Sequence, residues 1–142
     1  MPLKPHSELK YLRYEYDERE NVMRAWVPGG IKFVDHQISR EFFDEIMSIL
    51  KSCEHPPYVL ADLTGFEVPP YMSTDYANHM ARMKEYTLGV FRYGIPRDMG
   101  GELLSTTMHI AAMKAISRSN LYPDEKTARA AIREAKKASG AG

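Results

Sequence analysis

Several side chains that can bind ligands or move protons follow one apolar run of the chain. The run covers 58–63 and has Asp62 near its end, and the residues after it include Thr64, Tyr71, Ser73 and Thr74. An apolar run bounded by turn residues is typical of a strand buried on both faces. In α/β sheets, ligands and partners are met at the carboxyl ends of such strands. We therefore place the candidate binding surface on the loop from Asp62 to Thr74.

The polar residues of this loop have both functional and structural interpretations. Asp62 could be a ligand-binding or acid/base carboxylate, or it could accept backbone N–H bonds in the Thr64-Gly65 turn, which aspartates at strand ends commonly do. Ser73 or Thr74 could cap the next helix and stabilise it by about 1 kcal/mol. Either hydroxyl could instead carry a phosphate at the positive end of that helix. The structural interpretation is favoured for all three residues.

A second group of candidates surrounds the expected start of a long helix over 102–118. Arg92 and Arg97, with the exposed amides near Gly100-Gly101, could receive an anion. Arg92 could equally pair with a carboxylate on a neighbouring strand. His109 lies inside the helix, where a histidine is more often bonded to a backbone group than used as a base. The histidines lack the paired spacing of a helical metal site and the cysteine is single, so we expect neither metal nor cofactor.

The order of apolar patterns predicts an α/β protein with a mixed sheet. We expect strands over 9–16, 22–27, 58–63, 87–93 and 121–122, and helices over 39–53, 73–85, 102–118 and 123–137. The first two strands form a hairpin, and Ser39 caps the first helix. The resulting sheet has four or five strands, with 58–63 central, and about four helices cover it. We expect a single domain over 1–142, with a flexible arm at 1–8 and a flexible tail at 139–142.

Composition narrows the class of protein. The formal net charge is zero with 27% charged residues, which argues against binding to nucleic acid or anionic membranes through bulk electrostatics. The single cysteine allows no intrachain disulfide and favours a reducing compartment. No run approaches the roughly 20 apolar residues that a membrane span needs, and the first residues lack the apolar core of a signal peptide. We therefore expect a cytoplasmic protein without a membrane span.

Three segments resemble the STAS domain and its SpoIIAA-like relatives. They are Val59-Leu60-Ala61-Asp62-Leu63-Thr64-Gly65, Val90-Phe91-Arg92-Tyr93-Gly94 and the segment from Asn120 to Ala128. The resemblance implies a non-enzymatic regulatory domain that binds a protein partner or a small ligand. Partner-switching members carry a phosphorylatable serine just after the matching strand, where this chain has Pro69-Pro70-Tyr71-Met72. Ser73 and Thr74 follow slightly later, so the looser SpoIIAA-like group is the better comparison.

Two functional hypotheses follow. The first is a STAS-like regulatory or binding module that engages a protein partner or small ligand through the loop after strand 58–63 and the next helix. The second is a small-molecule-binding protein or enzyme that uses an apolar, methionine-lined cleft between helices 73–85 and 102–118. Its ligand would be small and apolar or anionic. Aromatic residues in the opening hairpin also predict a homodimer, because exposed aromatic patches mark interfaces. These residues are Tyr11, Tyr14, Tyr16 and Trp26.

Overall fold

Strand β4 (Tyr58–Asp62) lies at the centre of a four-stranded mixed sheet in the computed structural model, which describes residues 9–94 and 122–139. The strand order is β1-β2-β4-β6. Strand β4 runs parallel to both neighbours, and β1 is antiparallel to β2. The prediction that 58–63 is central is therefore confirmed. The other strands are β1 (Arg13–Asp17), β2 (Val22–Trp26) and β6 (Gly89–Tyr93).

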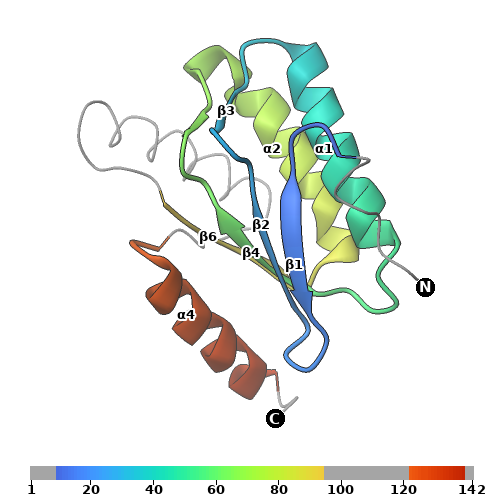
Figure 1. Ribbon diagram of the computed structural model, residues 1–142, viewed down its shortest axis with the longest axis vertical. Coiled ribbons are helices and arrows are strands. Elements are labelled where there is room, and N and C mark those ends of the chain that lie inside the picture. The colour runs from blue at the N-terminus through green and yellow to red at the C-terminus, as the bar shows by residue number, and fades with distance from the viewer. Residues whose placement is uncertain (1–8, 95–121, 140–142) are drawn as a thin grey trace.

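Helices cover both faces of this sheet (Figure 1). Helices α1 (His36–Lys51) and α2 (Ser73–Arg82) pack on one face, above a core that includes Val59, Phe43 and Met80. Helix α4 (Glu125–Ala138) packs on the other face, where Ala128 and Ile132 meet Leu60. Ala128 and Ile132 thus form the buried side of this helix. None of the helices in the described ranges is long and apolar enough to cross a membrane.

The opening hairpin forms as the alternation predicts. Tyr16 pairs with Met23 across the two strands, and Asn21 closes the turn with a positive φ of 56°. Leu12 and Tyr14 face the core beneath α1, as does Met23. Because Tyr11, Tyr14 and Tyr16 all pack against that core, they do not form the exposed aromatic patch on which the expected dimer was based. The homodimer itself stays a prediction.

Helix starts differ from the sequence predictions. Helix α1 begins at His36, and its N-cap is Asp35, whose Oδ1 accepts a 2.9 Å hydrogen bond from the Ile38 amide. Ser39 is therefore wrong as a cap, and it lies buried inside the helix. Helix α4 begins at Glu125, two residues later than expected, and its N-cap is Asp124. Ser139, assigned to the tail, is the C-cap of α4.

Helix α2 also lacks the expected cap. It follows directly from a short 3-10 turn, Pro70–Met72, so Ser73 is its first residue and no side chain caps it. The helix ends at Arg82 and continues as a 3-10 turn, Met83–Tyr86. The expected helix 102–118 and strand 121–122 lie outside the described residues, as do the arm at 1–8 and residues 140–142.

Candidate functional site

The loop after β4 is fixed against the segment after β2 by a second, two-stranded ladder. Strand β3 (Ile31–Lys32) pairs in parallel with β5 (Phe66–Glu67). The two backbones meet at Gly30 and Gly65, where a Cβ added to Gly30 would lie 2.4 Å from the Gly65 carbonyl oxygen. Such a contact is closer than any side chain allows, so both positions require glycine. The loop at the carboxyl end of the sheet is therefore held in one place.

Asp62 caps the turn that starts this loop. Its Oδ1 accepts hydrogen bonds from the Thr64 amide at 3.0 Å and from the Thr64 hydroxyl at 2.6 Å. Its Oδ2 lies 3.6 Å from Nη2 of Arg24. The structural interpretation of Asp62 is thus confirmed, and Thr64 acts with it.

Tyr71 and Val34 form an exposed apolar tip beyond this ladder. Tyr71 is 70% exposed and Val34 is 46% exposed. The Tyr71 hydroxyl donates a 2.8 Å hydrogen bond to the Val34 carbonyl oxygen, which ties the 3-10 turn to the segment after β3. We call these two residues the Val34–Tyr71 tip. Large apolar side chains held in a fixed orientation at the surface are typical anchors of protein interfaces.

Ser73 and Thr74 begin α2 next to this tip. The Ser73 hydroxyl donates a 2.9 Å hydrogen bond to the Pro70 carbonyl oxygen, whereas an N-cap side chain accepts a bond from an amide. The capping role predicted for Ser73 or Thr74 is therefore wrong. Thr74 is exposed.

Arg92 differs from the loop residues because its side chain lies inside the core. It is 1% exposed on the face of β6 that α1 and α2 cover, and it sits opposite Ala61 of β4. Among the described residues, none of its guanidinium nitrogens has a hydrogen-bond partner. The alternative pairing of Arg92 with a carboxylate of a neighbouring strand is not formed among the described residues, and Asp62 of β4 pairs with Arg24. Arg97 and His109 lie outside the described residues.

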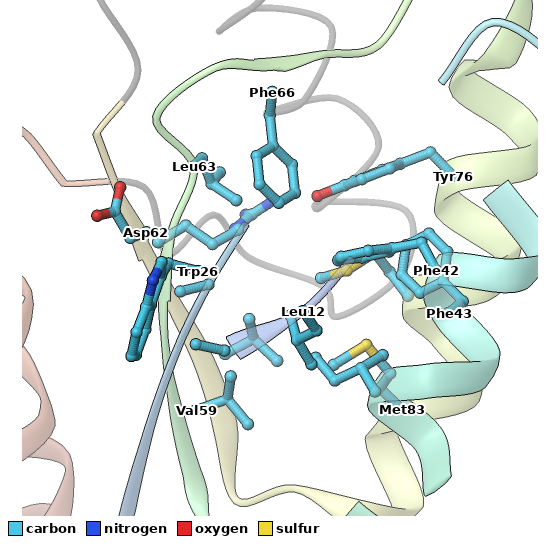
Figure 2. Close-up of a pocket in the computed structure, with 16 residues that line it drawn as sticks. Leu12, Trp26, Phe42, Phe43, Val59, Asp62, Leu63, Phe66, Tyr76 and Met83 are labelled. Carbon is cyan, nitrogen blue, oxygen red and sulfur yellow. The ribbon is translucent and has the colours of Figure 1, made fainter. Parts of the chain in front are cut away.

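A small cavity of about 30 Å³ adjoins Arg92 between the sheet and helices α1 and α2. It is lined by side chains that include Leu12, Val59, Phe66, Phe42 and Met83 (Figure 2). Tyr76 extends its ring from α2 toward the sheet. Burial raises the pKa of the Tyr76 hydroxyl, and the nearby Arg92 charge partly offsets that rise. The sequence pattern assigned Tyr76 to the apolar side of its helix and gave no signal of this polar neighbour.

A polar cluster that the sequence did not predict joins α1 to α2. The Ser39 hydroxyl donates a 2.6 Å hydrogen bond to Oδ2 of Asp75, and Nδ1 of His36 lies 3.0 Å from Oδ1. Nε2 of His79 lies 3.6 Å from the same Oδ2. The hydroxyl thus contacts the carboxylate directly and has no hydrogen bond to His79, so a histidine does not activate Ser39 as a nucleophile. Ser39 lies three residues before Phe42, on the buried side of α1. This helical spacing was the feature of the sequence that could have predicted that Ser39 is buried.

The other face of the sheet carries a second network, between the strands and α4. Nε of Arg24 donates a 3.0 Å hydrogen bond to the Tyr93 hydroxyl, which donates to Oε1 of Glu125 at 3.2 Å. Arg129 donates to Oε2 of the same carboxylate at 2.7 Å. Every charge in this network has a partner of opposite sign, so it joins elements together and leaves no free group for chemistry.

The described residues contain no group of three or more histidine, cysteine or carboxylate side chains that could hold a metal ion. Comparison with protein-family models finds no match for this chain, and comparison with curated proteins finds none either.

Proposed function

We propose that this chain is a non-enzymatic, STAS-like binding module that engages a protein partner through the Val34–Tyr71 tip and the start of α2. The observation that carries the proposal is the tip itself: a 70% exposed tyrosine tied by its hydroxyl to a neighbouring backbone. An aromatic side chain in a fixed position loses little conformational entropy when it is buried by a partner.

The position of the tip supports the same role. It stands beyond the carboxyl ends of the parallel strands β2 and β4, where α/β sheets meet their ligands. Charged residues flank it, among them Lys32 and Glu67, whose exposed side chains lie 3.5 Å apart. An apolar centre with a polar rim is the usual arrangement of an interface. The parallel arrangement of β2, β4 and β6 with an added hairpin supports the STAS-like assignment.

The chemistry of the described polar residues supports a module without catalysis. Asp62 and Thr64 bond to each other, and Ser39 donates to a carboxylate. Neither arrangement pairs a nucleophile with a base. The competing hypothesis, a cleft between the second helix and residues 102–118, depends on a segment outside the described residues.

A photo-crosslinking residue placed at position 71 tests the proposal in the native cell. The control is the same residue at position 88, because Leu88 is 55% exposed and precedes β6, at the opposite end of the sheet. We expect one discrete adduct from position 71 and none of the same mass from position 88. With the purified partner, Tyr71→Ala should weaken binding by about tenfold or more, as expected for an interface anchor, while Leu88→Ser should leave it unchanged. Equal adducts from both positions, or full binding by Tyr71→Ala, would refute the proposal.

A further inference from the structure

A groove lies between the start of strand β6 and the C-terminal half of helix α4. Tyr93 at the end of β6 contacts Glu125 at the start of α4, so the helix runs back along the strand (Figure 1). The last turns of α4 therefore lie beside the residues that precede β6. The space there has a volume of about 720 Å³, within the range of about 300–1,000 Å³ that ligand pockets have. We call it the β6–α4 groove, and its described lining includes Leu88, Phe91, Glu134 and Ala135.

Aromatic rings form the floor of the β6–α4 groove. The ring centroids of Phe91 and Tyr122 lie 6.0 Å apart with 14° between the ring planes, and the Tyr58 centroid lies 6.1 Å from that of Phe91. Gly89 adds no side chain to this floor, and a Cβ at its position would lie 3.0 Å from a ring carbon of Phe91. The floor is thus apolar and closely packed from below, which leaves the space above it for an occupant.

Small side chains form the helical wall of the groove. Ala131, Ala135 and Ala138 stand four and three residues apart on α4, so they share one side of the helix. Ala131 and Ala135 also pack against the core beneath α4. Helices approach each other to about 8–10 Å, depending on the side chains at the contact, and alanines permit the closest approach. This side of α4 can therefore receive another helix.

Leu88 projects from the rim of the same groove. It is 55% exposed, and its amide donates a 2.8 Å hydrogen bond to the Pro57 carbonyl oxygen, which fixes its backbone. The other exposed large apolar side chains of the described residues, Val34 and Tyr71, form the tip at the opposite end of the sheet. The groove and Leu88 thus place an apolar hollow and an apolar projection side by side.

The charges on this flank of α4 also complement each other. Glu134 and Lys137 stand one turn apart, 3.6 Å from each other, and both side chains are 76% exposed. In a two-fold interface the same patch meets itself, so every feature must find its complement within that patch. This patch contains a projection with a hollow and an acid with a base. Among possible occupants, a second copy of the chain fits it on both counts.

We propose that the β6–α4 groove is the interface of a homodimer in which the two α4 helices lie antiparallel. Leu88 of each copy enters the groove of the other, and Ala135 lies near the two-fold axis. Because Glu134 and Lys137 lie on the same flank of α4, this arrangement brings Glu134 of each copy to Lys137 of the other. Such exposed pairs set the register of the helices more than the affinity. The interface is independent of the Val34–Tyr71 tip and gives the expected homodimer a different surface from the hairpin aromatics.

Sedimentation equilibrium of the full chain tests the dimer and its surface. The unaltered chain should show a concentration-dependent equilibrium between monomer and dimer. Leu88→Asp charges the projection and Ala135→Glu fills the groove, so each should raise the dissociation constant at least about tenfold. The matched control is Ala81→Glu, at an exposed position of α2 outside the groove, which should leave the constant unchanged. A monomer at all concentrations, or a dimer that both groove variants leave intact, would overturn the proposal.

Charge exchange tests the antiparallel arrangement with substitutions at exposed positions. Glu134→Lys and Lys137→Glu should each weaken self-association, because two like charges then meet across the two-fold axis. An equimolar mixture of the two variants restores both attractive pairs, so the mixed dimer should be about fivefold tighter than either parent dimer. Equal affinities of the mixed and parent dimers would contradict the antiparallel pairing and overturn the proposal.

A photo-crosslinking residue at position 88 identifies the occupant of the groove directly. In a mixture of nitrogen-14 and nitrogen-15 chains, position 88 should crosslink to peptides of α4, and part of the products should combine one light and one heavy peptide. In the native cell, the adduct from position 88 should have the mass of two chains. Crosslinks confined to peptides of one label would assign the groove to the chain's own residues, and an adduct with a different protein would assign it to another partner. Either result would overturn the proposal.

Discussion

The hydroxyl of Ser39 donates a 2.6 Å hydrogen bond to the Asp75 carboxylate, and this bond joins helices α1 and α2 within their interface. Ser39 is 1% exposed, so its hydroxyl depends on Asp75 for a partner. Burial alone would raise the pKa of Asp75, but the hydrogen bonds from Ser39 and His36 and the nearby His79 lower it below its usual range. The carboxylate is thus held in its charged form between the two helices.

Removal of Asp75 should therefore destabilise the protein more than removal of Ser39. Asp75→Ala leaves the buried hydroxyl unpaired and should cost about 2–3 kcal/mol, whereas Ser39→Ala should cost about 1 kcal/mol, because the partly exposed carboxylate keeps other partners. The control is Asp44→Ala, since Asp44 meets Arg82 at 3.8 Å with both side chains about half exposed. That variant should lose less than about 0.5 kcal/mol. Urea unfolding measures all three, and equal costs for Asp75→Ala and Asp44→Ala would contradict this account.

His79 should make the stability of the protein depend on pH. Its ring stacks on Phe43 at 4.7 Å, and burial lowers its pKa from the usual 6.5, with Asp75 and Asp44 opposing the shift and Arg82 and Arg40 adding to it. Since the unfolded chain then takes up the proton more readily, stability should be complete above about pH 7 and fall as the pH drops through about 6.5, by at most about 1.4 kcal/mol per pH unit.

The comparison of His79→Gln with the unaltered chain isolates this effect. Urea unfolding between pH 5 and pH 8 should show a smaller pH dependence in His79→Gln, while His55→Gln, at an exposed position, should keep it. His36 also contacts Asp75, so the series is repeated with His36→Gln. An unchanged slope in His79→Gln would show that other groups cause the dependence.

The sequence predicted the sheet better than the polar sites, and the reason is physical. Alternation along 12–16 and 22–27 reports which face of a strand is buried, and that pattern is local. The environment of Arg92 is not local, because it depends on Ala25, Ala61 and Tyr76, which come from two other strands and a helix. The predictions of the helix caps were wrong for a related reason. Several neighbouring residues could act as the N-cap of α1, and the backbone conformation places Asp35, not Ser39, at that position.

The contact of Gly30 with Gly65 should be sensitive to a single methyl group. Gly29 and Gly30 have nearly the same positive φ, 77° and 78°, but a Cβ on Gly29 would meet nothing within 4 Å. Gly29→Ala should therefore cost about 1–2 kcal/mol for its backbone conformation alone. Gly30→Ala adds a collision with the Gly65 backbone and should cost at least about 2 kcal/mol more or abolish folding. Equal costs for the two variants, measured by urea unfolding, would show that the β3–β5 segments can separate freely.

Ser73 allows the strongest test of whether the loop is a phosphorylation switch. Ser73→Asp loses the hydrogen bond to the Pro70 carbonyl oxygen, worth about 1 kcal/mol at most at this surface position. It also places a carboxylate in the first turn of α2, which gains about 0.3–1 kcal/mol from the helix dipole. The two effects nearly cancel, so we expect Ser73→Asp to be silent in urea unfolding and in crosslinking from position 71. The control is Ser73→Ala, which loses the same hydrogen bond without adding a charge. A serine switch would instead change the crosslinked adduct while stability stays constant. Mass spectrometry of the protein from its native cell provides the independent check, and phosphate on Ser73 or Thr74 there would count directly against the silent outcome.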